Sequence, residues 1–276
     1  MNKLIQVGGR LIDLSEPQVM GILNCTPDSF YSGSRVQTEK EIAERAVQII
    51  AEGGTMIDVG AFSTRPGAAE VDEYEEMRRL RGALEIVCRE APGAIVSVDT
   101  FRPDVARMVV EEYGVAVIND VSEGGVTGIV NTPIEPCEDD CPAMFRMVAR
   151  LRVPYVLMSV RPTVEETLKV LSGKVQQLRA LGQNDIIIDP GFGFGKTLEE
   201  NYSLLGRLEC LHVLGLPLLV GLSRKSMIYK LLEIDPSHAL NGTAVLHTIA
   251  LMKGASILRV HDVREAVEAV RIIHHL

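Results

Sequence analysis

The sequence contains no tryptophan, and aromatic residues make up only 4% of its 276 positions. Hydrophobic residues still reach 46% and charged residues 24%, so the apolar content is mostly aliphatic. This composition is typical of a globular enzyme with an aliphatic core and argues against a disordered chain.

Basic residues are also scarce. The chain has 28 Lys and Arg against 37 Asp and Glu, which gives a net charge of −9. Nucleic-acid binding normally requires a basic surface, so we expect no nucleic-acid partner. A small anionic ligand stays possible, because a few local arginines do not show in a net charge.

The sequence also lacks long apolar runs, and its five cysteines are an odd number. The longest apolar stretch, LHVLGLPLLVGL, contains His and Pro and is too short to span a bilayer. The N-terminal MNKLIQVGGR lacks the apolar region of a signal peptide. An odd, scattered set of cysteines indicates a reducing compartment. These cysteines are Cys25, Cys88, Cys137, Cys141 and Cys210. The sequence therefore predicts a cytoplasmic protein with no membrane partner.

Short β-branched runs recur along the chain, each bounded by turn residues. Most are nearly continuous in apolar residues, as expected of parallel strands covered on both faces. The runs are VMGILN (19–24), TMIDVG (55–60), AIVSVDT (94–100), VAVINDV (115–121), PYVLMS (154–159), DIIIDP (185–190), PLLVGLS (217–223) and ILRVHD (257–262).

The stretches between these runs have helical spacing, and three of them begin with a capping box. The boxes pair Thr38 with Glu41, Thr163 with Glu166, and Thr197 with Glu200. Repeated strand-then-helix units predict an α/β (β/α)₈ barrel, whose typical length of about 250 residues fits the chain better than a doubly wound sheet does. We expect one domain over residues 1–276, with LIQVGGRLIDL forming a hairpin over the bottom of the barrel.

Nearly every predicted strand ends in a side chain that is charged or can hydrogen-bond. These residues are Asn24, Ser63-Thr64-Arg65, Asp99, Asn119, Ser159, Asp189, Arg224-Lys225, and Arg259 with His261. Any one of them has an alternative interpretation as a helix cap or turn former. As a set they predict an active site, because a barrel of this type gathers its chemistry at the C-terminal ends of the strands.

The stretch DPGFGFGKT (189–197) looks like a phosphate-binding loop but fits neither nucleotide motif. A P-loop requires glycine where this chain has Pro190. The dinucleotide fingerprint requires two residues before its third glycine, and Gly195 follows after only one. The remaining interpretation is a strand ending in the Asp189 carboxylate, then a loop whose glycines let Phe192 and Phe194 lie against a flat ligand.

Seven motifs, in order from residue 20 to residue 263, together resemble the dihydropteroate synthase family of folate biosynthesis. They are MGILNCTPDSF (20–30), STRPGA (63–68), SVDT (97–100), IND (118–120), DPGFGFGKT (189–197), GLSRKS (221–226) and RVHDV (259–263). The resemblance covers nearly the whole chain. It implies a pterin-binding (β/α)₈ barrel, usually a homodimer that uses Mg²⁺ and is a sulfonamide target. The implied reaction joins 6-hydroxymethyl-7,8-dihydropterin diphosphate to 4-aminobenzoate and releases pyrophosphate.

The resemblance also assigns residues to the pterin. A pterin has a donor edge and an acceptor edge, so it calls for carboxylates on one side and a cation on the other. Asp189 matches the acceptor for the donor edge, while Asp99 and Asn119 match groups that read the opposite ring. Lys225 matches the donor to O4 and N5, and Met158 completes this set. Lys225 should stay protonated because it lies near two carboxylates.

The resemblance also assigns residues to the diphosphate, to the aminobenzoate, to Mg²⁺ and to catalysis. The diphosphate set is Asn24, Thr64, Arg65, Arg259 and His261, and the aminobenzoate set is Thr64, Pro66, Phe194, Lys225 and Ser226. Asn24 also matches the residue associated with Mg²⁺, a metal that prefers oxygen ligands; its alternative is a turn cap. The catalytic set is Lys225, Arg65, Asp99, Arg259 and His261. Two long loops, roughly 24–37 and 61–70, close over the site in the family.

The implied mechanism begins with departure of pyrophosphate, which leaves a cation delocalised over the pterin, and ends with attack by the aniline nitrogen. It requires positioning and electrostatic stabilisation but no covalent nucleophile. Cys25 is therefore interpreted as a small buried hydrophobe rather than a nucleophile.

Four places depart from the usual family pattern. Cys25 replaces an aliphatic residue, Ala61-Phe62 replaces Gly-Glu, and Ser159 stands where a His is frequent. The stretch 128–141 is longer than usual, and its Cys137 and Cys141 alone make a weak metal site.

Three rival functions stay open at this stage. A pterin-dependent methyltransferase that serves a corrinoid would share the residues Asp99, Asn119 and Asp189, but it would need no diphosphate site. A non-catalytic pterin-binding paralogue predicts loss of Arg65, Lys225 or Arg259, all of which are present. A Schiff-base aldolase using Lys225 is disfavoured by the position of this lysine in a turn after the strand.

Overall fold

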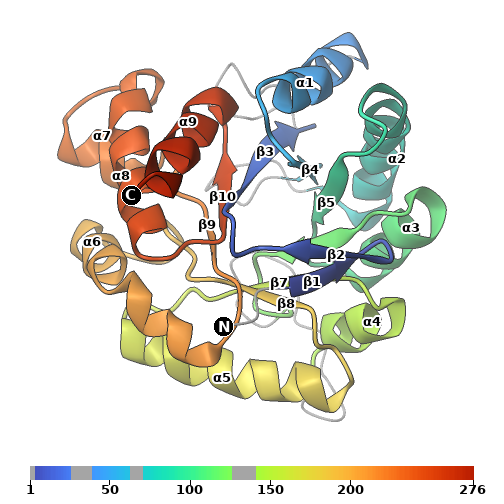
Figure 1. The fold of residues 1–276 in the computed structure, drawn as a ribbon. Coiled ribbons are helices and arrows are strands. Elements are labelled where there is room, and N and C mark those ends of the chain that lie inside the picture. The colour runs from blue at the N-terminus through green and yellow to red at the C-terminus, as the bar shows by residue number, and fades with distance from the viewer. Residues whose placement is uncertain (1–3, 26–38, 63–70, 126–140) are drawn as a thin grey trace.

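The computed structural model describes residues 4–25, 39–62, 71–125 and 141–276. Within these ranges it contains a parallel barrel sheet surrounded by helices (Figure 1). The barrel strands are β3 (Gln18–Asn24), β4 (Met56–Gly60), β5 (Ile95–Asp99), β6 (Val117–Asp120), β7 (Tyr155–Met158), β8 (Ile186–Asp189), β9 (Leu219–Val220) and β10 (Ile257–Val260). Each coincides with one of the predicted runs.

The strands are hydrogen-bonded in the order β8-β7-β6-β5-β4-β3-β10-β9, and every adjacent pair is parallel. A parallel bridge between Ile188 and Leu218 joins the two outer strands and closes the ring. The predicted (β/α)₈ barrel is therefore confirmed, and the doubly wound alternative is wrong.

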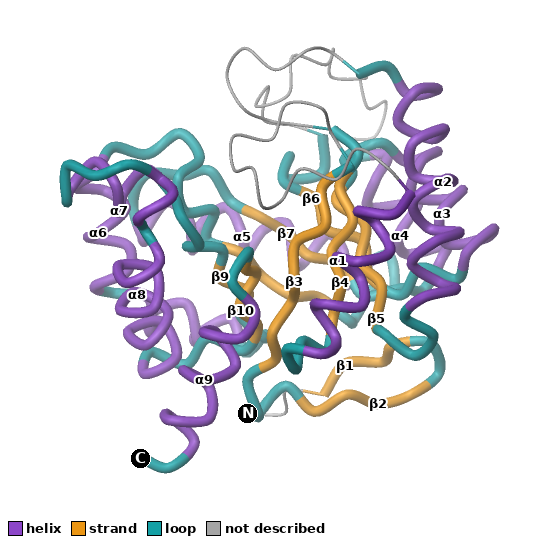
Figure 2. The backbone as a smooth tube through the Cα atoms, turned by 90° about the horizontal axis from the view of Figure 1, so that it is seen from above, coloured by secondary structure: helices purple, strands orange, loops and turns teal. Residues whose placement is uncertain are grey.

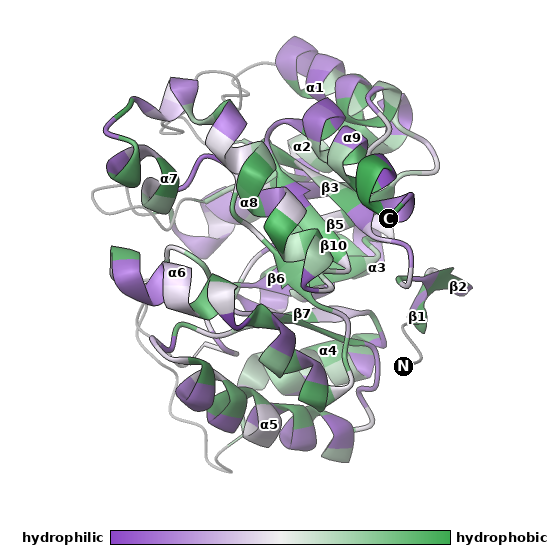
Figure 3. Ribbon diagram, turned by 60° about the vertical axis from the view of Figure 1, so that its left-hand side comes forward, coloured by the Kyte–Doolittle hydropathy of each residue, from purple (hydrophilic) through white to green (hydrophobic). Residues whose placement is uncertain are grey.

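Helices follow the strands and cover the outside of the barrel (Figure 1). They are α1 (Glu39–Ala51), α2 (Glu73–Glu90), α3 (Pro103–Tyr113), α4 (Ala143–Leu151), α5 (Val164–Ala180), α6 (Leu198–Gly206), α7 (Ser226–Leu231), α8 (Leu240–Met252) and α9 (Val263–His274), with 3₁₀ segments η2 (Leu208–Leu214) and η3 (Pro236–His238). Figure 3 shows largely hydrophobic strands inside and helices that alternate between hydrophobic and hydrophilic residues outside. No described helix is both long and apolar enough to cross a membrane.

Two of the three predicted capping boxes lie within the described residues, and in both the threonine caps its helix. Thr197 and Glu200 form the complete reciprocal capping box of α6. The Thr163 hydroxyl oxygen accepts the Glu166 N–H at the start of α5, although the Glu166 carboxylate bonds the Thr163 hydroxyl rather than its backbone. The third box lies partly outside the described residues, because Thr38 is not among them.

The N-terminal segment forms the predicted hairpin of β1 (Leu4–Val7) and β2 (Arg10–Asp13). Its turn uses Gly8 and Gly9 at φ values of +53° and +80°, which side chains rarely adopt. The hairpin lies across the end of the barrel where the strands begin (Figure 2). Its Ile5 and Val7 pack against a layer of inward side chains there: Met20, Met56, Val117, Val156, Ile187, Leu219 and Ile257.

Candidate active site

The inner face of the barrel changes from apolar to polar within two residues along several strands. Because side chains alternate across a strand, positions two apart point to the same side. The paired positions are Met56 and Asp58, Val117 and Asn119, Ile187 and Asp189, and Ile257 and Arg259. The polar members lie toward the C-terminal ends of the strands, which is where the sequence predicts a site.

Asp58 on β4 is the centre of this polar layer, and sequence analysis missed it. Its side chain is fully buried. Its Oδ1 accepts the Ser97 hydroxyl at 2.6 Å, and its Oδ2 accepts Asn119 Nδ2 at 3.0 Å and Arg259 Nε at 2.6 Å. The carboxylate thus fixes the orientation of two predicted ligand-binding residues. The available signal was a lone acidic residue inside the apolar run TMIDVG.

Arg259 lies between two carboxylates. Besides its bond to Asp58, its guanidinium NH2 group donates to Asp99 Oδ2 at 3.1 Å. Asp99 Oδ1 is buried and makes no hydrogen bond, which is unusual for a buried carboxylate oxygen. Burial raises the pKa of Asp99 to about 7, against the opposing effect of Arg259. The site therefore holds a cation already balanced by carboxylates, next to a buried acceptor that makes no hydrogen bond.

Asp189 and Lys225 are two further ionisable groups of the mouth, and each affects the pKa of the other. Burial raises the pKa of Asp189, and Lys225 is the strongest opposing influence. Burial also lowers the pKa of Lys225 to about 8, with Asp189 acting in the opposite direction. Lys225 therefore stays largely protonated at neutral pH, in agreement with the sequence-based expectation.

The glycines of DPGFGFGKT make room for close contacts rather than for a phosphate. At Gly191, a Cβ would lie 2.1 Å from the Ser159 carbonyl oxygen, and at Gly193 it would lie 3.0 Å from Cδ of Lys225. Lys225 reaches across this loop and donates to the carbonyl of Phe192. A side chain at Gly191 would collide with Ser159, and one at Gly193 would crowd Lys225. Both positions also have a positive φ, which favours glycine.

The two phenylalanines of this loop have different environments. Phe192 is fully buried and belongs to the hydrophobic core, so the expectation that it lies against a flat ligand is wrong. Phe194 is partly exposed, and its ring lies 4.6 Å from Lys225 Nζ. Lys196, the lysine of the Gly-Lys-Thr ending, donates to the carbonyls of Ser159, Gly191 and Phe194 and so secures the loop itself.

The other described site residues also lie at the strand ends. Asn24 ends β3 beside Gly60, where an added Cβ would come 3.2 Å from Asn24 Oδ1. His261 follows β10, and its Nδ1 lies 3.2 Å from the Ser223 hydroxyl. Met158 ends β7 in register with Asp189, and Ser226 begins α7. The predicted Thr64, Arg65 and Pro66 lie outside the described residues, as do Cys137 and most of the loops 24–37, 61–70 and 128–141.

The Mg²⁺ assignment can be tested against the donor set. The described residues contain no cluster of three or more His, Cys, Asp or Glu side chains suited to a metal. Mg²⁺ usually keeps several waters and binds through one or two protein oxygens together with substrate phosphates. A single side-chain oxygen from Asn24, together with waters and substrate phosphates, fits this description of a Mg²⁺ site.

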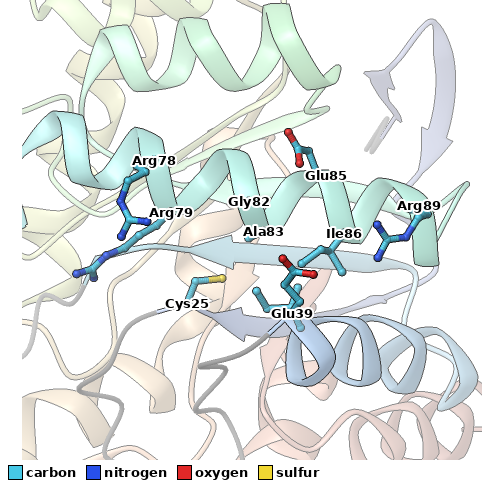
Figure 4. A pocket seen from close by; sticks show the side chains of 10 residues that line it. Cys25, Glu39, Arg78, Arg79, Gly82, Ala83, Glu85, Ile86 and Arg89 are labelled. Carbon is cyan, nitrogen blue, oxygen red and sulfur yellow. The ribbon is translucent and has the colours of Figure 1, made fainter.

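A separate hollow of about 290 Å³ lies outside the barrel between α1 and α2 (Figure 4). Its arginines are engaged, since Arg78 and Arg79 pair with Glu75 and Arg89 pairs with Glu90. Cys25 lines it, and burial raises the pKa of this thiol to about 12. A thiol that does not ionise is a poor nucleophile, so covalent catalysis by Cys25 is disfavoured.

Comparison with known proteins identifies the family. Residues 20–261 match the family model described as pterin binding enzyme. The dihydropteroate synthase of Escherichia coli K12 is 40% identical over 267 residues, which cover 96% of this chain and 93% of that protein. The chain belongs to the dihydropteroate synthase family.

Solved structures of this family agree closely with the barrel. A Yersinia pestis dihydropteroate synthase in complex with a sulfonamide drug has a TM-score of 0.87 and 36% identity, covering 99% of this chain and 98% of that one. A Xanthomonas albilineans dihydropteroate synthase with 4-aminobenzoic acid has a TM-score of 0.86 and 35% identity, covering 100% and 98%. The family predicted from the seven motifs is confirmed.

Proposed function

We propose that the protein condenses 6-hydroxymethyl-7,8-dihydropterin diphosphate with 4-aminobenzoate to form 7,8-dihydropteroate and pyrophosphate. The observation that carries the proposal is the convergence of Asp99, Asn119, Asp189, Lys225 and Arg259 at one end of the barrel. We further propose that residues 1–276 act as a single pterin-binding domain.

The pterin ring would lie between the Arg259 and Asp99 ion pair on one side and Asp189 with Lys225 on the other. In this proposal the Asp189 carboxylate accepts hydrogen bonds from the 2-amino group and N3–H, and Lys225 donates to O4 and N5. Asn119 donates one amide hydrogen to Asp58 and so presents its remaining groups to the opposite ring. The free Oδ1 of Asp99 is a further acceptor for that ring, and Met158 supplies an apolar contact.

The diphosphate would lie at the ends of β3 and β10. Arg259, His261 and Asn24 are the described members of its site, and Thr64 and Arg65 complete the proposed set. Asn24 would hold Mg²⁺ together with diphosphate oxygens, and the metal would supply positive charge to the leaving group. Backbone N–H groups and side-chain cations that are already in place where negative charge develops stabilise a transition state without reorganising.

Bond breaking comes first in the proposed mechanism. The bond between the pterin methylene and the diphosphate oxygen breaks, and the electron pair leaves with pyrophosphate. The resulting cation is delocalised over the pterin ring between Asp99 and Asp189. The aniline nitrogen of 4-aminobenzoate then attacks the methylene and loses a proton. Phe194, Lys225 and Ser226 would form the aminobenzoate site with Thr64 and Pro66.

A homodimer is proposed on the basis of exposed apolar side chains on neighbouring helices. Leu231 and Leu232 at the end of α7 are 52% and 50% exposed, and Val245 and Met252 on α8 are 51% and 69% exposed. These two helices contact each other, and an exposed apolar patch over neighbouring elements is typical of protein interfaces. A cytoplasmic location is proposed because Cys25, Cys88, Cys141 and Cys210 are all free thiols.

The test is release of pyrophosphate from the dihydropterin diphosphate with Mg²⁺, measured with and without 4-aminobenzoate. We expect aminobenzoate-dependent turnover that Lys225→Ala reduces by about 100-fold or more, the effect of removing one preorganised donor. The control Lys230→Ala removes an exposed lysine of α7 and should leave turnover unchanged. Tight pterin binding without pyrophosphate release would instead support a methyltransferase or a non-catalytic paralogue.

A further inference from the structure

Three consecutive residues after β9 have three different tasks. Ser223 contacts His261, because its hydroxyl oxygen accepts the His261 backbone N–H at 3.2 Å and lies 3.2 Å from Nδ1 of the same residue. Lys225 reaches the Asp189 side of the mouth, as described above. Arg224 lies between them, and neither the pterin set nor the diphosphate set uses it.

Arg224 makes a two-pronged contact with Asp262, the residue that follows His261. Its Nε donates to Asp262 Oδ2 at 2.9 Å, and its NH2 group donates to Oδ1 at 2.8 Å. The two side chains are only 7% and 13% exposed. Paired hydrogen bonds of this kind fix direction as well as distance, which a lysine cannot do.

The rest of Arg224 is also held. Its NH1 group donates to the carbonyls of Pro236 and Ser237 in η3, and its backbone N–H donates to the Thr243 hydroxyl of α8 at 3.0 Å. Its φ of +53° lies in the left-handed region, which residues other than glycine rarely adopt. Such a conformation persists where the surrounding contacts determine it, and it often marks a functional site.

We propose that Arg224 is a positioning residue that fixes the distance between the pterin site and the diphosphate site through Asp262. The loop after β9 carries Lys225, adjacent to Arg224 in sequence, and the loop after the neighbouring strand β10 carries His261, adjacent to Asp262. The pair therefore joins the two loops directly behind the two side chains. The inference rests on the proposed function, because it requires one ligand that contacts both sites.

A positioning role for the Arg224 and Asp262 pair affects ligand binding, whereas a purely stabilising role affects only the free energy of unfolding. A buried ion pair contributes little net stability compared with apolar residues of the same volume, so stability alone does not explain the pair. A ligand that spans two sites gains affinity only if the sites are held at the matching distance. Ligands that occupy one site alone are insensitive to that distance.

The experiment compares a spanning ligand with its two parts. Dissociation constants are measured for the dihydropterin diphosphate, for 6-hydroxymethylpterin and for pyrophosphate with Mg²⁺, using wild type, Arg224→Gln and Arg224→Lys. We expect both variants to bind the spanning ligand about 10- to 100-fold more weakly and each part less than about threefold more weakly. The double variant Arg224→Gln/Asp262→Asn should lose no more than Arg224→Gln alone.

Arg81→Gln is the matched control, because Arg81 makes a similar two-pronged contact with Glu112 on the exposed outer helices. Asp262→Asn keeps the shape of its side chain and replaces Arg224→Gln if that variant does not fold. Equal weakening of all three ligands, or unchanged binding of the spanning ligand, overturns the inference. Failure of the wild type to bind the spanning ligand overturns the proposed function itself.

Discussion

The two ends of this barrel are built from the same strands but do different work. At the end covered by the β1-β2 hairpin, inward side chains such as Met56 and Ile187 form a dry apolar layer. Two residues further along the same strands, Asp58 and Asp189 are buried carboxylates. The apolar layer, which acts through packing alone, thus lies about 7 Å from the polar layer that carries the chemistry, the rise of two residues along a strand.

The charged side chains at the polar end are stabilised by hydrogen bonds and ion pairs with one another rather than by exposure to water. Asp58 receives three hydrogen bonds, and Arg259 is shared between two carboxylates. Unpaired buried charges are strongly unfavourable, so each member depends on the others. The apolar end has no such interdependence, and its side chains act through packing.

Replacing Asp58 should have the largest effect, because it disturbs both stability and chemistry. Asp58→Asn keeps the shape but removes the charge that faces Arg259, and we expect the free energy of unfolding to fall by about 3 kcal/mol. The catalytic efficiency kcat/KM should fall with it, since Arg259 and Asn119 lose their common anchor. Urea unfolding and steady-state kinetics measure the two effects. The control Asp104→Asn neutralises an exposed carboxylate on α3, and equal behaviour of the two variants would contradict the role of Asp58.

The hairpin should affect stability alone. Ile5 is 1% exposed beneath the barrel, so Ile5→Ala should lower the free energy of unfolding by about 2–4 kcal/mol through lost burial and a cavity. KM for the pterin substrate should not change. Leu11→Ala, at a position 69% exposed on the same hairpin, should do neither. A raised KM in Ile5→Ala would break the separation between the two ends.

A smaller change to the polar end tests its internal connections. Ser97→Ala removes the hydroxyl that donates to Asp58 at 2.6 Å, and a hydrogen bond to a charged group contributes about 2 kcal/mol. We expect a loss of that size in unfolding free energy, together with a raised KM for the pterin substrate as Asp58 reorients. Ser172→Ala on the outer helix α5 is the control. Loss of stability with unchanged KM would show that Ser97 does not act through the site.

The mildest test uses pH instead of a large structural change. Burial lowers the pKa of Lys225 to about 8, so its ammonium group is present below that pH and is lost above it. The kcat/KM for the pterin substrate should therefore fall about tenfold per pH unit above pH 8. Lys225→Arg, which stays charged, should be slower at pH 7 but flat through pH 9.

The same titration has the opposite sign for stability. A buried lysine with a depressed pKa penalises the folded state while it is charged, so the Lys225 contribution should become more favourable between pH 8 and its unfolded value of about 10.5. For activity, a wild-type kcat/KM that stays constant between pH 8 and pH 10 would contradict the proposed role of the ammonium group.

Much of the fold was predictable because the barrel strands are short, separate and nearly continuous in apolar residues. The strand ends were predictable for the same reason, since Asp99, Asn119 and Asp189 come where the apolar run stops. Asp58 was missed because it lies inside its run, and a one-dimensional pattern does not say which side chains face a shared interior.

Orientation was also the reason for the error at Phe192. Two phenylalanines separated by one glycine look equivalent in DPGFGFGKT, but only Phe194 stays near the mouth, while Phe192 enters the core. The pairing of Arg224 with Asp262 joins residues 38 positions apart. It depends on the closure of β9 against β10, which the local sequence does not encode.

The most direct test of the separation between the two ends uses two positions on one strand, Ile187 and Asp189 of β8. The account predicts that Ile187→Ala lowers the free energy of unfolding by about 2–4 kcal/mol and leaves kcat/KM for pyrophosphate release unchanged. It predicts that Asp189→Asn changes the unfolding free energy by less than about 1 kcal/mol, because burial raises the pKa of Asp189 and so already penalises its charged form. It also predicts that this variant lowers kcat/KM by about 100-fold. If both variants lose stability and activity in the same proportion, the two layers are not separate and the account is wrong.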